Sequence, residues 1–417
     1  MVCFDGPAMS DSLWRSGQFR AYLSSTAFSG MALAMQQLLL SWTLIGILLL
    51  PANEVGLLQA LIGVPGIFFM LLGGARADRA DPRRQLMYIY LLAPVFPIFL
   101  IAMALPGWLA VWNVVVWGLG IGVVQSLSMP AQQALLNRSS GAHVQQGVTA
   151  ATVAGFVVQV VGLGLAGQID RLGISWILGC QAVALLCASF AISRLPAEVP
   201  ATPAPGVSAL AQIREGLRAT LQNRVIFDVL TINFTSSIFN AGSFMTVFPF
   251  IVKGVYGGDA LLLASLMALF FAGAAISNAL LLRFMPLMHP GRVFLIMQLS
   301  RIVVLGLLYL EGELWLLVLA TFLWGLNMGI TTNLARTVVQ ESASPEYLGR
   351  IMAVFSIGMV GSAPVGAIVL GWLIETTGIL NALLPAMVLS LLLFAYGILA
   401  TGVWQYRSAQ ALRAAES

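Results

Sequence analysis

Three charged side chains lie inside apolar runs of the sequence, where they could carry chemistry. Asp228, Arg301 and Arg336 each have mainly apolar neighbours. A charge deep in hydrocarbon costs about 2.5–3.5 kcal/mol on insertion scales, so such a residue usually faces a cavity or another polar group. Asp228 and Arg336 could form a gate pair, or Asp228 could accept a proton; anchoring at an interface is the alternative. Arg301 could have a functional role or could bind a carbonyl or an amide.

Amide side chains in the same kind of run form a second candidate set. Gln36 and Gln37 are adjacent, so they point about 100° apart on a helix and cannot share one face. We expect four amides to line a cavity: Gln37, Gln125, Asn240 and Asn327. The alternative is hydrogen bonding between helices, which contributes about 0.6 kcal/mol per bond on average.

The sequence contains no residue pattern typical of an enzyme, a metal site or a nucleic-acid-binding surface. The sequence has no GxxxxGK[ST] phosphate-binding loop, and its two histidines, His143 and His289, lie in polar loops without a metal or nucleophile partner. Its three cysteines show no metal-ligand spacing. The basic residues are scattered and form no stripe of the kind that binds nucleic acid. We therefore predict no enzymatic activity, cofactor, metal site or nucleic-acid partner.

The composition indicates which elements position these residues. Hydrophobic residues make up 59% of the chain and charged residues 9%, whereas a soluble domain is about 25% charged. A helix needs about 20 apolar residues to cross a bilayer, and such windows recur along the chain. We predict an all-α membrane protein with twelve spans, at residues 18–48, 54–76, 84–105, 109–136, 143–169, 174–195, 222–252, 260–283, 291–310, 314–338, 347–374 and 380–404.

The basic residues predict the orientation of these spans. Cytoplasmic loops carry an excess of Lys and Arg. With the N-terminus in the cytoplasm, seventeen of the twenty basic residues fall on the inner side, and Arg171 and Lys253 alone face outward. Asp5 and Asp11 lie where a signal peptide would be basic. We therefore expect a multi-pass protein whose N- and C-termini are both cytoplasmic.

The two halves of the sequence resemble each other at an offset of about 207 residues. WGLGIG at 117–122 recurs as WGLNMG at 324–329, and a series of glycines ending at Gly173 recurs as one ending at Gly378. Six spans is an even number, so the halves share one orientation around a central cavity. The predicted domains are an N-terminal six-helix bundle (1–195), a linker with an amphipathic helix (196–221) and a C-terminal six-helix bundle (222–417).

The loop after the second span carries the most specific motif, GGARADRADPRR at 73–84. It is similar to the signature of the major facilitator superfamily, although Arg76 replaces a usual Leu and Asp81-Pro82 replaces Gly-Arg. In that family the loop latches the cytoplasmic ends of the two halves together. The resemblance assigns this latch to Gly74, Asp78, Arg79, Arg83 and Arg84; the alternative is that the arginines merely hold the loop in the cytoplasm.

A finer resemblance is to the branch of macrolide-efflux proteins and the enterobactin exporter. It rests on Phe19-Arg20, PAQQALLNR at 130–138 and REGLR at 214–218. This resemblance implies export. We expect a monomeric secondary transporter of the bacterial inner membrane that moves a small hydrophobic or amphipathic compound by alternating access. An uptake permease or a lysophospholipid flippase is the alternative. Protons are a possible coupling partner, but the Arg in span four and the Pro in span five that proton antiporters often carry are absent at 114–122 and 162–167.

Overall fold

The computed structural model describes residues 16–77, 81–140, 144–197 and 209–416. Within these residues twelve helical segments are long and apolar enough to cross a membrane, which confirms the predicted number of spans. Their positions agree with the sequence to within a few residues. The span expected at 18–48, for instance, is the segment Gly17–Ile47, and the span expected at 174–195 is Ile174–Ser193.

The chain divides into two compact units, of which unit 1 contains residues 1–40 and 65–206. Its third span is broken at Ala93 and Pro94 into two shorter helices, because a proline removes a backbone donor and clashes with the preceding turn. The helices assigned wholly or largely to it are α2 (Gly17–Trp42), α4 (Pro82–Leu92), α5 (Val95–Ala104), α6 (Val111–Ser140), α7 (Val144–Ala166), α8 (Ile169–Leu172) and α9 (Ile174–Ser193). Helix α9 packs against α4 and α5, and α6 packs against α4 and α7.

Unit 2 contains residues 41–64 and 207–417. Its helix α15 packs against α13 and α14, while α11 packs against α16. The elements are α10 (Ala209–Gln222), α11 (Arg224–Gly242), η3 (Ser243–Val247), α12 (Phe248–Phe250), η4 (Ile251–Val255), α13 (Ala260–Phe284), α14 (Pro290–Tyr309), α15 (Leu314–Ser342), α16 (Leu348–Thr377), η5 (Asn381–Leu383), α17 (Leu384–Leu399) and α18 (Ala409–Glu416).

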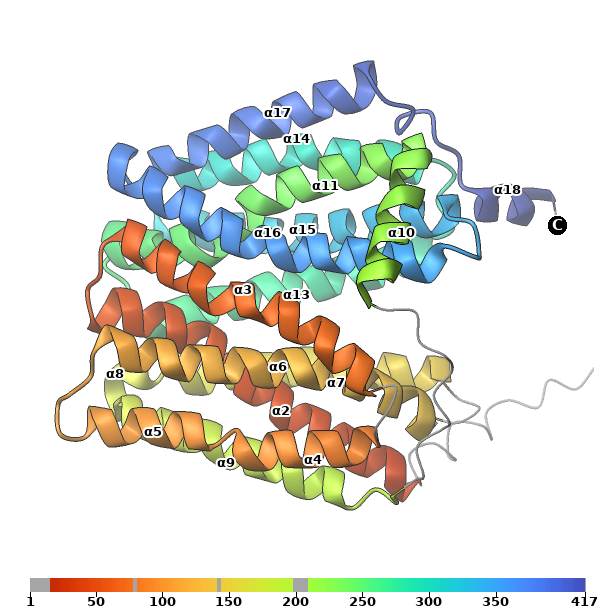
Figure 1. Ribbon diagram of the computed structural model, residues 1–417. Coiled ribbons are helices and arrows are strands. Elements are labelled where there is room, and N and C mark those ends of the chain that lie inside the picture. Colours follow the sequence, from red (N-terminus) through yellow and green to blue (C-terminus); the bar gives the residue numbers. More distant parts are fainter. Residues whose placement is uncertain (1–15, 78–80, 141–143, 198–208, 417) are drawn as a thin grey trace, which may run out of the picture. The chain divides into compact units, whose positions relative to one another are not determined.

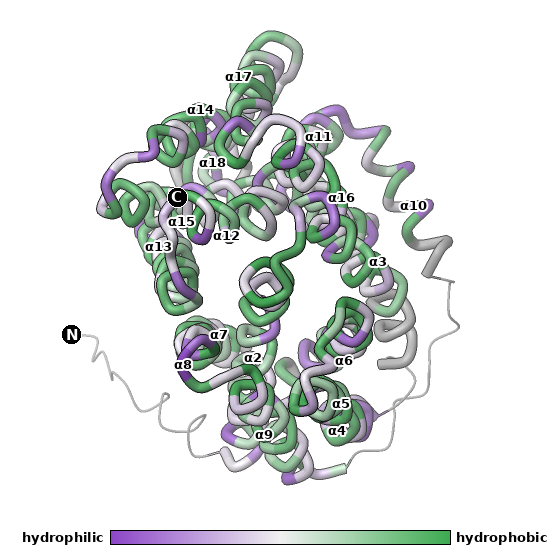
Figure 2. Tube along the Cα trace, turned by 90° about the vertical axis from the view of Figure 1, so that its left-hand side faces the viewer, coloured by the Kyte–Doolittle hydropathy of each residue, from purple (hydrophilic) through white to green (hydrophobic). Residues whose placement is uncertain are grey.

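Helix α10 is the amphipathic helix that the sequence predicts in the linker. Hydrophilic and hydrophobic residues alternate along it (Figure 2), and it crosses the first turns of α16 (Figure 1). The close approach depends on Gly216, because a Cβ there would overlap the Arg350 carbonyl group. The Arg350 guanidinium also lies 3.0 Å from the Glu215 carboxylate.

Residues 41–64 pack with the second half of the chain although they belong to its first two spans. They include the π-helical turn η1 (Thr43–Ile47) and the first half of α3 (Ala52–Ala77). A Cβ on Gly56 would overlap the Ala367 carbonyl group of α16, so α3 and α16 are in backbone contact. The compact units thus divide the chain after residues 40, 64 and 206.

The internal repeat is visible in the backbone where spans one and seven end. The amide of Leu48 donates to Thr43 at 2.9 Å, and the amide of Tyr256 donates to Ile251 at 3.2 Å. Each π turn is then followed by a residue in the left-handed region, Leu49 with φ +53° and Gly257 with φ +59°. The two turns thus share one geometry at an offset of 208 residues in sequence, which agrees with the offset read from the motifs.

Candidate functional site

A pocket of about 370 Å³ opens between α2, α6 and α7 of unit 1. Gln37 comes from α2 and Gln125 from the middle of α6, so the structure brings these two predicted cavity residues together. The described residues that line it are Gly30, Leu33, Ala34, Gln37, Gln125, Thr152, Gly155, Phe156 and Gln159. No residue of this lining is charged, and polar amides alternate with aliphatic and aromatic surface.

The packing of α2 against α7 positions the pocket. A Cβ at Gly162 would lie 2.6 Å from the Met31 carbonyl oxygen, so the glycine lets the two helices touch. Small residues serve such close approaches in membrane helices. The contact places the side chains that flank it, Gln37 on α2 and Gln159 on α7, at the same pocket.

The amides of this pocket are available to a ligand. Among the described residues, Gln37, Gln125 and Gln159 make no hydrogen bond to the protein. Thr152 instead donates its hydroxyl hydrogen to the Val148 carbonyl within α7, at 2.8 Å. Each free amide can donate two hydrogen bonds and accept two. The pocket can therefore bind an uncharged molecule that carries carbonyl, hydroxyl or amide groups beside apolar surface.

Gln36, the neighbour of Gln37, belongs to a packing network instead. The fully buried Gln181 of α9 donates to Gln36 Oε1 at 3.1 Å and to the Ala32 carbonyl at 3.0 Å. Its own oxygen accepts a hydrogen bond from the Trp117 indole at 3.2 Å. Because Gln36 and Gln37 point to different faces of the helix, Gln36 packs against α9 while Gln37 lines the pocket.

The two asparagines predicted to line the cavity are engaged in hydrogen bonds within unit 2. Asn240 Oδ1 accepts from the Trp324 indole at 2.6 Å. Asn327 is 3% exposed, and its amide donates to the Met297 carbonyl and the Ser300 hydroxyl, both at 2.7 Å. These contacts are the hydrogen bonding between helices that the sequence left open as the alternative.

Asp228 is fully buried and pairs with Arg224 one turn earlier, at 3.2 Å. The hydroxyl of Tyr396 on α17 donates to the same carboxylate at 3.3 Å. Arg336 is exposed, and its guanidinium lies 5.8 Å from the centre of the Phe355 ring. The ion pair that the structure gives Asp228 is therefore with Arg224 and not with Arg336.

Arg301 is 4% exposed in the middle of α14. Its Nη1 donates to Gln298 Oε1 at 3.2 Å, and Gln298 is itself fully buried. The structure thus gives Arg301 the amide partner that was one of its two predicted alternatives. The pocket in unit 1 does not include it.

The motif loop is described in part. Asp78 and Arg79 lie outside the described residues, and Gly74 lies near the end of α3. Arg83 Nη2 donates to the Ser193 carbonyl at the end of α9, at 2.6 Å, while Arg84 is exposed. The contacts described for this loop therefore tie it to unit 1.

Sequence reasoning missed three residues that the structure makes prominent. Gln159 and Thr152 lie on span five, where we predicted no cavity residue, although a lone Gln in an apolar run is a visible signal. Asp81 caps α4 by accepting from the Arg83 amide at 3.0 Å, ahead of Pro82. It also lies 3.9 Å from the Arg138 guanidinium. An Asp-Pro pair before a helix predicts such a cap.

Three solved structures described as transporters have a fold similar to that of this chain. A variant of the nucleoside transporter NupG is 14% identical, with a TM-score of 0.74 over 91% of this chain and 99% of that one. A bacterial homologue of the human lysosomal transporter Spinster is 14% identical, with a TM-score of 0.69 over 94% and 98%. A POT-family peptide transporter is 13% identical, with a TM-score of 0.66 over 96% and 97%.

The sequence itself matches one family model. Residues 22–367 match the Major Facilitator Superfamily, whereas no match was found among curated proteins. The match covers most of the chain, and the twelve helical segments agree with it. The chain therefore belongs to the major facilitator superfamily and is a multi-pass membrane transporter.

Proposed function

We propose that this transporter exports a small, uncharged, amphipathic compound across a bacterial inner membrane by alternating access. One observation carries the substrate class: among the described residues, the pocket of unit 1 is lined by three amides without protein partners, beside Leu33 and Phe156, and by no charged group. A charged substrate would leave its charge unpaired there, at a cost of several kcal/mol. Export is the direction implied by the resemblance to the efflux branch.

In the proposal, residues 41–64 take part in the conformational change of the transport cycle. Their contact with unit 2 is built from glycine packing and from polar bonds, including the Thr246 hydroxyl donating to Gln59 Oε1 at 2.7 Å and the Lys253 ammonium donating to the Gly46 carbonyl at 3.2 Å. In the proposed cycle this contact breaks when the outer side opens. The motif loop, with Gly74, Asp78, Arg79, Arg83 and Arg84, stabilises the cytoplasmic side in the opposite phase.

Proton coupling rests on Asp228. Its carboxylate is fully buried and holds Arg224 and Tyr396 together. Protonation would weaken both contacts, because a neutral carboxyl no longer attracts the guanidinium and accepts hydrogen bonds less strongly. In the proposal this change loosens α17 from α11 and links proton binding to the conformational cycle.

A susceptibility screen tests the proposed function. A strain lacking the gene is compared with one that expresses it, using neutral, anionic and cationic amphipathic compounds of similar size. The proposal predicts that expression lowers the intracellular level of neutral members of the panel. Greater accumulation on expression would indicate uptake, and an effect confined to charged compounds would contradict the proposed substrate class.

A further inference from the structure

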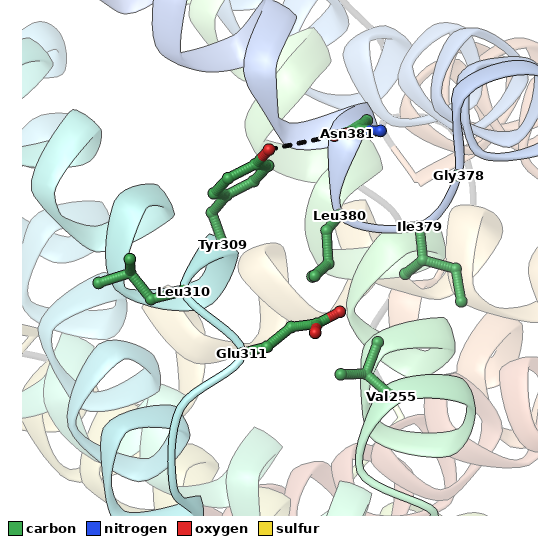
Figure 3. Close-up of a pocket in the computed structure, with 8 residues that line it drawn as sticks. All are labelled: Val255, Tyr309, Leu310, Glu311, Gly378, Ile379, Leu380 and Asn381. Carbon is green, nitrogen blue, oxygen red and sulfur yellow. Dashed lines mark hydrogen bonds between the residues drawn. The ribbon is translucent and has the colours of Figure 1, made fainter.

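A second pocket lies in unit 2, at the opposite end of α16 from α10. Helix α10 contacts Arg350 in the first turn of α16, whereas the pocket adjoins the loop that follows Thr377, the last residue of α16. Its volume is about 530 Å³. The pocket is lined by Val255, Tyr309, Leu310, Glu311, Gly378, Ile379, Leu380 and Asn381 (Figure 3).

The pocket presents one carboxylate among aliphatic side chains. Figure 3 shows the Glu311 carboxylate directed into the space beside Leu380, Ile379 and Val255. None of the eight lining residues is basic, and Glu311 forms no ion pair within the described parts of the chain. The negative charge of Glu311 is therefore available to a ligand.

The neighbouring polar groups leave hydrogen-bond acceptors facing this pocket. The Tyr309 hydroxyl donates to Asn381 Oδ1 at 3.2 Å, and Asn381 Nδ2 donates to the Thr377 carbonyl at 2.8 Å. The oxygen and the nitrogen of the Asn381 amide thus each have one partner in the protein, while the phenolic oxygen of Tyr309 can still accept. A donor-rich cationic group would find acceptors here and no competing cation.

The backbone at Glu311 supports a built site. Its φ is +45°, in the left-handed region that favours glycine. Such strain persists only where the surroundings hold it, and it is common at binding sites. Burial and then the negative charge of Glu311 raise the pKa of Tyr256, so the carboxylate acts on a second polar group beside the pocket.

We propose that this pocket binds a small organic ammonium ion with an apolar body. The carboxylate would pair with the ammonium group, and Val255, Ile379 and Leu380 would cover the apolar part. A divalent cation is a poorer match, because calcium takes 6–8 oxygen ligands and the lining offers a single carboxylate. The ammonium could belong to a soluble amine or to a phosphatidylethanolamine headgroup.

Ligand binding to the purified full-length protein tests this site. Saturation-transfer NMR would compare cyclohexylammonium with cyclohexanol, using phosphatidylcholine nanodiscs and subtracting the signal of protein-free nanodiscs. We expect the ammonium to bind at least tenfold more tightly than the alcohol. Glu311→Gln should remove this difference. Glu313→Gln should retain it, because Glu313 is exposed on the same loop but does not line the pocket.

The outcomes separate the proposal from general charge attraction. Equal affinity of the two probes, unchanged preference in Glu311→Gln, or the same loss in both variants would overturn it. Size-exclusion chromatography and thermal unfolding confirm that both near-isosteric variants fold. In phosphatidylethanolamine nanodiscs, binding weakened at least tenfold identifies the lipid headgroup as occupant, whereas unchanged binding identifies a soluble amine.

Discussion

At the scale of single residues, the amides divide into those engaged by the protein and those left to a ligand. Gln181 bonds to three groups in the core of unit 1, while Gln37 and Gln125 face a pocket. The sequence could predict that Gln36 and Gln37 differ, because helix geometry separates them. It could not assign Asn240 or Asn327, because a polar residue on a membrane helix suits a cavity and a neighbouring helix equally well.

The division of the amides predicts that substitutions in the two classes affect stability to different extents. Gln181→Leu should lower the free energy of unfolding by about 1–3 kcal/mol, because it leaves the buried Trp117 indole and the Gln36 amide without their partner. Gln37→Leu should leave it nearly unchanged. Thermal unfolding of the purified variants measures this difference, and equal destabilisation by both would argue against two classes of amide.

Asp228 shows where a partner could not be predicted. The sequence suggested Arg336, but Arg224 lies one turn away on the same helix and pairs with Asp228 at 3.2 Å. An i,i+4 pair forms without any tertiary contact, so it forms more readily than a pair between helices. The apolar runs of the sequence alone do not distinguish between these two partners.

The proposed coupling role of Asp228 predicts a selective loss. Asp228→Asn mimics the protonated carboxyl, so it should abolish substrate accumulation driven by a pH gradient while retaining exchange of labelled for unlabelled substrate. Both rates are measured in proteoliposomes. The matched control is Asp259→Asn, because Asp259 is exposed and caps α13 through Leu262, a role that Asn can also perform. Gradient-driven accumulation at the wild-type level in Asp228→Asn would rule out the coupling role.

At the scale of elements, the close packing of α3 on α16 is the feature that carries the conformational proposal. Glycines allow it at Gly56 and again at Gly371, where a Cβ would lie 3.1 Å from the Gly56 Cα. The glycine series was visible in the sequence of span eleven. Its partner was not, because small residues indicate a close approach without naming the helix approached.

A larger side chain at this contact should favour the conformer in which residues 41–64 are released from the rest of unit 2. Gly56→Val should disfavour the packing of residues 41–64 on unit 2, by analogy with overpacked cores, where extra methylenes cost about 1–3 kcal/mol. Thiol labelling of a cysteine introduced at the buried Thr246 would then rise several-fold. Gly164→Val is the control, since a Cβ at Gly164 meets nothing within 4 Å. Unchanged labelling in Gly56→Val would show that the contact is not part of the cycle.

At the scale of the whole molecule, composition and charge predicted the fold more reliably than any motif predicted a site. Backbone groups in hydrocarbon must bond within their own helix, so apolar runs of sufficient length left few choices, and all twelve spans are observed. The compact units do not follow the limits of the spans. Residues 41–64 join unit 2, because tertiary packing can divide a span that hydropathy treats as continuous.

Transport by the pocket of unit 1 is the central claim, and inside-out vesicles test it most directly. Vesicles containing the wild-type protein should accumulate at least one neutral amphipathic compound saturably. Gln125→Leu should lower kcat/KM by about two- to tenfold, as expected when a ligand loses a hydrogen bond worth about 0.5–1.5 kcal/mol. Gln340→Leu, at an exposed position of α15, should transport normally. Transport of the same compound at the wild-type rate by Gln125→Leu would contradict the account.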